Sequence, residues 1–404
     1  MPATALPRFA ARNGMECIQC HVNPTGGGMR NAYGRNVFEN AVLPRSTVKE
    51  PDTWLAQPFP VEGEESPVDV GRRVPGFSPD LTEWLAIGAD VRLAHIFIRP
   101  DKGPTEDTKR EITNSFFLMQ GDLYHSARIG EALTLYLDVG VYSGFEAWGL
   151  FRLLEDGPLY LKAGRFLPGF GIREVEHQLF TREGIGFGAT DRDTGLELTY
   201  YLGPLTTNLG VFNGTLGDTA FDASGKDRRT FEKAVVARAS VRGTFGLLRG
   251  QVGGSFYWDD NSNQPNPLLA GSVPSSLSTE AARGVAENRV DAFVTANLGR
   301  FTYLGDIAAV RDRFSSPEVP KLTGYATYQE LSFIATQGVE FIGTFEHMDP
   351  DIEVLRDARM RAGLVVEVFP FPFVELRAMV RRSWGGEAPT GGQWDTVVFL
   401  HLFM

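Results

Sequence analysis

Leu133-Thr134-Leu135-Tyr136-Leu137-Asp138-Val139-Gly140-Val141-Tyr142 places Leu or Val at every second position. A period of two is typical of a β-strand with one apolar and one polar face. The same alternation returns over residues 235–242 and 374–381. A soluble β-sandwich has this alternation too, so the connections between the strands must decide the fold class.

The connections alternate between short and long along residues 81–404, which contain about sixteen such segments. Short turns are expected near residues 129–131, 155–158, 203–204, 243–244, 299–300, 337–338 and 370–372, and long loops near 100–110, 167–191, 213–230, 259–285, 312–319, 347–355 and 383–391. Only the turn at Ser143-Gly144 departs from this order. Short turns at one end and long loops at the other are typical of barrels in the bacterial outer membrane. The sequence therefore predicts an all-β fold, a transmembrane antiparallel β-barrel of about sixteen strands.

Composition excludes several other classes. The 404 residues carry a net charge of −11, and no basic cluster stands out, which argues against nucleic acid as a partner. No apolar run approaches the roughly 18 residues of a membrane helix. Residues 1–11 lack a charged start and a long apolar stretch, so we expect the chain to be a mature protein.

A second signal lies near the start of the chain, in Cys17-Ile18-Gln19-Cys20-His21. Two thiols three residues apart, followed directly by a histidine, form the attachment signature of c-type haem. Each thiol adds to one haem vinyl group, and the histidine becomes an axial ligand to iron. Cys17 and Cys20 are the only cysteines in the chain. We therefore expect one covalently bound haem c held by Cys17, Cys20 and His21.

Three other interpretations of this region are weaker. A thioredoxin-like pair would need a βαβ setting, and structural zinc would need two further ligands. Gly26-Gly27-Gly28 could cradle phosphate, but no Lys-Ser/Thr follows it. We expect the glycines to let backbone approach a flat ring closely.

The second axial ligand of the iron is less defined by the sequence. Met29 lies eight residues after His21 and is the favoured candidate, the alternative being a core methionine. Met15 is expected to pack, and His177 is a further candidate ligand from a long loop. The remaining histidines are expected to be lumen or loop side chains: His95, His125, His347 and His401.

The N-terminal region resembles the outer-membrane cytochrome–porin fusions of iron-oxidising bacteria. The residues that carry the likeness are Pro7-Arg8-Phe9-Ala10, Gly14-Met15, Cys17, Cys20, His21 and Gly34-Arg35-Asn36-Val37-Phe38. The resemblance implies a monohaem segment joined to a porin barrel. Here Thr25 and the triple glycine are inserted between Pro24 and the Gly-Arg pair, a departure that bears on the ferrous-iron role.

The middle of the chain is similar to the phosphate-selective porin family. The matching residues are Lys162-Ala163-Gly164-Arg165-Phe166-Leu167-Pro168-Gly169-Phe170-Gly171, Arg192-Asp193-Thr194-Gly195 and Gly210-Val211-Phe212-Asn213-Gly214. In that family the corresponding loop narrows the pore, which implies a constriction loop over residues 167–191. No lysine-rich site is evident here, so the likeness implies the fold and not the substrate.

Together these patterns predict three regions: a mainly helical monohaem segment over residues 1–43, a linker rich in Pro and Glu over 44–80, and the barrel over 81–404. The main hypothesis is an outer-membrane electron-transfer protein whose N-terminal segment plugs the lumen. It would oxidise extracellular ferrous iron and pass electrons to a periplasmic c-type cytochrome, as a ferrous iron:cytochrome c oxidoreductase. Two alternatives remain: a diffusion porin with a periplasmic haem segment, or the barrel component of a larger cytochrome conduit.

Overall fold

The computed structural model describes residues 7–45, 84–101, 113–141, 144–154, 157–174, 178–214, 233–259, 284–314, 321–386 and 392–403. Within these ranges, no helix has both the length and the apolar character needed to cross a membrane. Most of the predicted linker and His177 lie outside the described residues.

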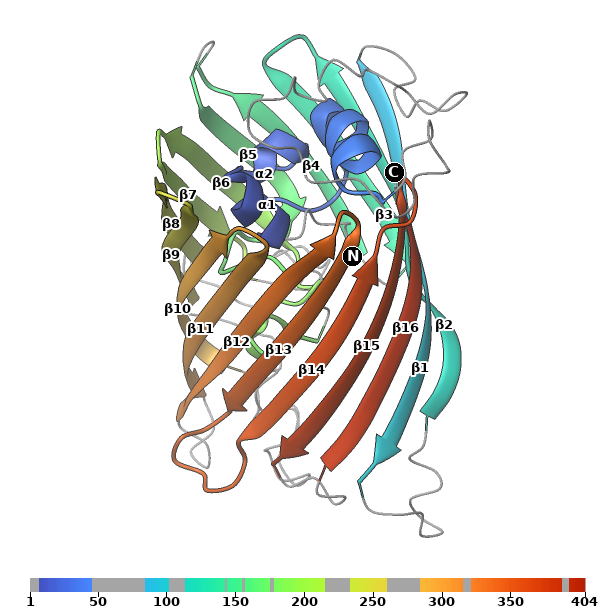
Figure 1. Cartoon of the computed structure of the whole chain (residues 1–404). Coiled ribbons are helices and arrows are strands. Elements are labelled where there is room, and N and C mark those ends of the chain that lie inside the picture. Colours follow the sequence, from blue (N-terminus) through green and yellow to red (C-terminus); the bar gives the residue numbers. More distant parts are fainter. Residues whose placement is uncertain are drawn as a thin grey trace.

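Sixteen strands form one closed antiparallel barrel, in which each strand pairs with its sequence neighbours and the last strand pairs with the first (Figure 1). The strands are β1 (Leu85–Pro100), β2 (Thr113–Ile129), β3 (Leu133–Val141), β4 (Gly144–Arg152), β5 (Leu159–Phe166), β6 (Asp193–Leu202), β7 (Leu205–Phe212), β8 (Ala234–Phe245), β9 (Leu248–Asp259), β10 (Gly284–Leu298), β11 (Phe301–Phe314), β12 (Lys321–Thr336), β13 (Val339–Asp349), β14 (Arg359–Val368), β15 (Val374–Gly385) and β16 (Gly392–Phe403). The prediction of a barrel of about sixteen strands is confirmed.

The barrel exposes its apolar side chains and buries its polar ones. On β3, Leu135 and Val139 are 44% and 48% exposed, whereas Tyr136 and Asp138 are 4% and 0% exposed. A soluble protein would show the reverse. Because outward apolar and inward polar residues alternate along each strand, the outer face is suited to lipid and the lumen is polar.

The turns between strands follow the predicted alternation. Tight turns at 203–204, 299–300 and 337–338 lie at one end of the barrel. Gly203, Gly299 and Gly338 have φ values of 57°, 58° and 71°, a left-handed conformation in which glycine avoids steric strain. The strand bounds put the long connections at the opposite end. In outer-membrane barrels the short turns face the periplasm.

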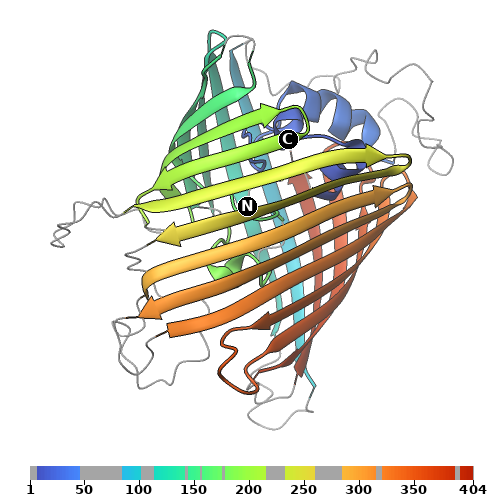
Figure 2. The same ribbon diagram turned by 90° about the vertical axis from the view of Figure 1, so that its left-hand side faces the viewer.

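Within residues 7–45 there are three short helices: α1 (Pro7–Asn13), α2 (Cys17–Cys20) and the π-type helix η1 (Gly34–Val42). The helix predicted over residues 30–42 begins later than expected, because Arg30 pairs with His21 in a β-bridge. The helices are set into the end of the barrel near the C-terminus (Figures 1 and 2). Backbone of this segment reaches the short turns, since the Arg45 amide donates to the Phe369 carbonyl over 2.7 Å.

The loop predicted to narrow the pore does fold into the lumen. Gly169 and Gly171 donate backbone hydrogen bonds to Glu197 of β6 and Ser255 of β9. Farther along, Phe180 donates its amide to Glu346 of β13 over 3.0 Å. These partners lie on well-separated strands, so the loop crosses the interior of the barrel; Figure 2 shows part of it, in green, within the ring of strands.

Candidate functional site

Helix α2 presents the two thiols and is fixed to the barrel wall at its first turn. Gln19 and Glu16 form a capping box, in which the Glu16 amide donates to Gln19 Oε1 over 2.7 Å. Glu16 Oε1 also accepts a 2.5 Å hydrogen bond from Thr206 of β7 and lies 3.2 Å from Arg242 of β8. The cysteine motif is therefore held inside the lumen and does not hang below the barrel.

His21 follows directly and is 1% exposed. Its amide donates to the Cys17 carbonyl over 2.9 Å, and its Nδ1 lies 3.3 Å from the Gly28 carbonyl oxygen. A hydrogen bond from one ring nitrogen to a carbonyl is how proteins orient a metal-binding histidine. The motif thus holds its histidine in a defined ring orientation.

Backbone conformation and close neighbours require glycine at the three positions beside His21. Gly26, Gly27 and Gly28 all have left-handed backbone, with φ values of 84°, 77° and 66°. A Cβ at Gly26 would lie 3.2 Å from Cys17 Sγ, and one at Gly27 would lie 2.7 Å from the Arg173 guanidinium. The run brings backbone against the cysteine and against the constriction loop.

Met29 lies on a segment that pairs with the motif, but its surroundings differ from those of His21. The Val22 amide donates to the Met29 carbonyl over 3.1 Å. The Met29 side chain is fully buried in a cluster that includes Tyr124 and Tyr136, and its amide donates to the Tyr136 hydroxyl over 3.1 Å. Met29 therefore packs against the wall formed by β2 and β3, whereas Met15 is half-buried near α1.

Helix α1 anchors the segment through two buried arginines on one helix face. Arg8 lies 3.3 Å from Glu330, 3.2 Å from Glu340 and 2.5 Å from Glu367. Arg12 forms a two-pronged pair with Glu340. Because these carboxylates project from β12, β13 and β14, the helix is bound to the lumen wall by fully desolvated ion pairs.

Burial determines the protonation states of His21, Cys17 and Cys20. Burial, assisted by the positive charges of Arg30 and Arg173, lowers the pKa of His21 to about 3. The imidazole is therefore neutral, which is the form that ligates a metal. Burial also raises the pKa of Cys20 to about 11 and the pKa of Cys17 above its usual value. Both thiols are thus neutral in the folded chain.

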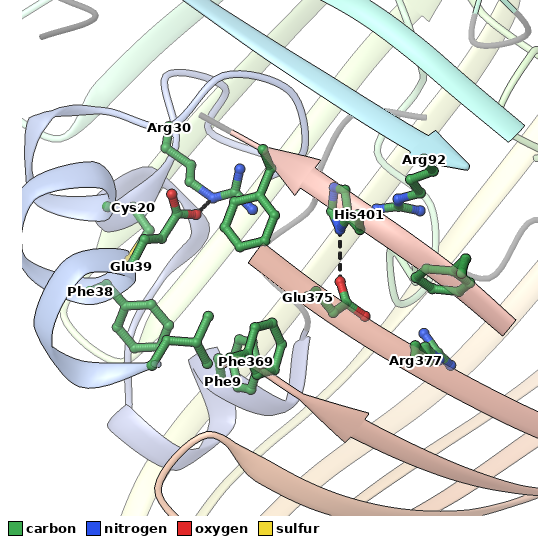
Figure 3. Close-up of a pocket in the computed structure, with 14 residues that line it drawn as sticks. Phe9, Cys20, Arg30, Phe38, Glu39, Arg92, Phe369, Glu375, Arg377 and His401 are labelled. Carbon is green, nitrogen blue, oxygen red and sulfur yellow. Dashed lines mark hydrogen bonds and ion pairs between the residues drawn. The ribbon is translucent and has the colours of Figure 1, made fainter. Parts of the chain in front are cut away.

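The donor set fits a c-type haem: two thiols at helical spacing and a neutral, oriented histidine, beside a glycine run that permits close approach. A pocket beside Cys20 has several phenylalanine walls, but neither Cys17 nor His21 lines it (Figure 3). Its cavity volume is only about 30 Å³, so a haem there requires its side chains to move apart. In the described ranges, this region included, no three His, Cys, Asp or Glu side chains gather closely enough to hold a metal ion.

Sequence reasoning missed the barrel side of this pocket. Arg92, Arg377 and His401 line it together with Cys20 and Arg30. Strand alternation assigns Arg377 to a polar face, but β1 pairs with β16, the neighbour of β15, only because the barrel closes. No local pattern connects residue 92 with residues 377 and 401, so the sequence offered no signal for this grouping.

Comparison with known proteins gives a likeness in fold. No protein-family model matches the chain. No curated protein matches it either. Among solved structures, OprB of Pseudomonas putida is similar, with a TM-score of 0.54 and 11% identity over 80% of this chain and 94% of that one. An anion-selective porin from Comamonas acidovorans gives 0.53, with 10% identity over 79% and 99%, and a loop-deletion mutant of OmpT of Vibrio cholerae gives 0.52, with 12% identity over 79% and 99%.

The class that the fold defines is therefore that of the porin-like outer-membrane barrels. The sixteen-strand closure and the apolar outer face agree with these structures. The predicted location in the bacterial outer membrane is confirmed, and so is the predicted contact of the barrel with membrane lipid.

Proposed function

We propose that this chain is an outer-membrane electron-transfer protein that carries one covalent haem c in the lumen of its barrel. The observation that carries the proposal is the position of the only cysteine pair. Cys17 and Cys20 lie on a helix that Glu16 ties to β7 and β8, and His21 beside them is buried. A haem-attachment motif inside the lumen would obstruct an open diffusion channel, so its position favours a redox role.

The roles of the residues follow from their chemistry. Cys17 and Cys20 would attach the haem through thioether bonds, and His21 would be one axial ligand. Met29 stays the candidate for the other axial position, for which its side chain would have to turn away from Tyr136. When bound, the haem supplies a one-electron redox centre. The Gly28 carbonyl holds the His21 ring, and α1 keeps the segment in the lumen.

The partners follow from where the segment lies. It contacts the short turns, the end that faces the periplasm in outer-membrane barrels. A periplasmic c-type cytochrome could approach that end, and an extracellular metal ion such as ferrous iron would act as donor from the other. On this proposal the activity is that of a ferrous iron:cytochrome c oxidoreductase.

Loss of the thiols tests the haem directly. In Cys17→Ala and Cys20→Ala double variants, peroxidase-active haem should disappear from the protein on a denaturing gel. The barrel should remain heat-modifiable, because neither cysteine belongs to a strand. Covalent haem retained by the double variant would refute the assignment.

The second candidate is a diffusion porin, and the likeness to solved porins supports a pore more directly than a redox role. Single-channel conductance separates the two. If α1 and α2 plug the lumen, the full chain should conduct poorly and a variant lacking residues 1–45 should conduct several-fold better. Equal, large conductance of both proteins would favour the diffusion porin.

A further inference from the structure

The connection between β13 and β14 carries four acidic side chains: Asp349, Asp351, Glu353 and Asp357. It belongs to the long-loop end of the barrel, and Figure 1 shows it at the end opposite α1 and α2. In outer-membrane barrels the long loops face the outside of the cell. An acidic loop does not by itself define a site, so the contacts of each carboxylate decide what the loop can bind.

Two of the four carboxylates have ordinary surface contacts. Glu353 pairs with Lys321 of β12 over 2.8 Å, and its side chain is 64% exposed. Asp351 Oδ1 accepts a 3.2 Å hydrogen bond from the Glu353 amide. Exposed pairs of this kind are well solvated and hold little energy. Neither contact therefore indicates a ligand.

Asp357 and Asp349 differ, because each has a buried oxygen that lacks a partner. Asp357 is 8% exposed; its Oδ2 accepts a 3.2 Å hydrogen bond from the Asp351 amide. Its Oδ1 is buried and accepts no hydrogen bond, and the same holds for Asp349 Oδ1. Neither carboxylate belongs to an ion pair in the part of the chain that the structure describes. Buried carboxylate oxygens normally have a donor or a cation beside them, so this pair calls for one.

The two carboxylates lie close enough to act on one another. Burial raises the pKa of Asp357, and the negative charge of Asp349 raises it further. The hydrogen bond from the Asp351 amide opposes this shift without cancelling it. The negative charge at this position is therefore not balanced by the protein groups around it.

Hydrogen bonds to neighbouring strands fix the two ends of the loop. On one side the Ile352 amide donates to the Thr323 carbonyl of β12 over 2.9 Å. On the other side Gly386, which directly follows β15, donates its amide to the Ala358 carbonyl over 2.7 Å. The loop base is thus tied to the strands on both sides. Its two carboxylates are presented at defined positions, which lowers the cost of ordering a binding site.

We propose that Asp349 and Asp357 bind a hard divalent cation, Ca²⁺, at the outer rim of the barrel. Carboxylate oxygens are the ligands that such ions prefer, and Ca²⁺ accepts flexible geometry. Because no three acidic side chains converge in the described ranges, the ion keeps water in further positions. We therefore expect an affinity of about 10⁻⁴–10⁻³ M, the range of extracellular calcium modules. The inference concerns this loop alone and does not depend on haem.

The test compares Asp349→Asn and Asp357→Asn with Glu353→Gln in the full-length protein. Glu353→Gln is the matched control, because it removes one negative charge from the same loop at an exposed, paired position. Ca²⁺ binding is measured by titration calorimetry at pH 8. The wild type and the control should bind one ion with similar affinity. Each asparagine variant should bind about tenfold more weakly or worse, because it loses a ligand.

Limited proteolysis gives a second readout. Arg356 is exposed and directly precedes Asp357, so trypsin can cut between them. Ca²⁺ should slow this cut in the wild type and in Glu353→Gln, and should have no effect in the asparagine variants. If an asparagine variant fails to insert, the wild-type protein with and without Ca²⁺ carries the test. Heat modifiability on a gel shows which variants have an intact barrel.

Acidity should weaken the site. Because the pKa of Asp357 is raised, its carboxylate gains a proton at a higher pH than usual, and the proton competes with the ion. Ca²⁺ affinity should therefore be lower at pH 5 than at pH 8.

Two outcomes would overturn the proposal. A wild-type protein that neither binds Ca²⁺ nor is protected by it at pH 8 would show that the pair holds a proton instead. Equal Ca²⁺ affinity of the wild type and both asparagine variants would show that the ion is attracted by the acidic loop in general.

Discussion

His21 and Met29 lie on paired backbone segments, yet only His21 is oriented by the motif itself. Its Nδ1 faces the Gly28 carbonyl at 3.3 Å, whereas Met29 is buried in the cluster that contains Tyr136. The local spacing of the motif therefore predicts the first ligand well. The surroundings of Met29 depend on a tyrosine that lies 107 positions away, which no local pattern reveals.

Replacement of Met29 tests whether it leaves that cluster to bind iron. If it is the ligand, Met29→Ala should lower the reduction potential, because thioether ligation favours the ferrous state. The weak sulfur-to-iron band in the red region of the oxidised spectrum should also vanish. An unchanged spectrum and potential would leave Met29 as a packing residue.

At the scale of elements, α1 is the main anchor of the N-terminal segment. Arg8 is fully buried, and its partners Glu330, Glu340 and Glu367 come from three adjacent strands. Removing one partner of a buried ion pair costs about 3–5 kcal/mol, because the remaining charges stay buried without compensation. The docking of α1 is therefore more sensitive to this residue than the barrel is.

Arg8→Gln should release the N-terminal segment while the strands remain folded. In membranes, protease should then cut residues 1–45 while the barrel stays resistant. The matched control is Arg382→Gln: its ion pair with Asp101 is largely exposed, and such pairs contribute about 0–1 kcal/mol. Equal protection of the N-terminal segment in both variants would show that α1 is held by other contacts.

Sequence reasoning predicted the elements of the barrel better than those of the plug. Alternation over Leu133–Val141 reflects contacts with lipid and lumen that repeat every second residue, so it can be read locally. The helix expected from Arg30 begins instead at Gly34, because Arg30 pairs with His21. The Arg8–Glu330 contact joins residues 322 positions apart, and only the docking of α1 in the lumen brings them together.

At the scale of the whole molecule, the barrel spans the membrane while the proposed haem segment lies at its short-turn end. The constriction loop also enters the lumen, and Arg173 of that loop contacts Gly27. The N-terminal segment and the constriction loop therefore approach each other inside the lumen. On the proposed function, electrons pass between an outer donor and an inner acceptor through the haem held by this segment.

One measurement tests this claim most directly. The protein is placed in sealed vesicles that contain oxidised soluble cytochrome c, and ferrous iron is supplied only outside. We expect the trapped cytochrome to become reduced with the wild-type protein and to stay oxidised with the Cys17→Ala/Cys20→Ala variant, whose barrel is intact. Reduction at the same rate with both proteins, or with neither, would contradict electron transfer through a haem in the lumen.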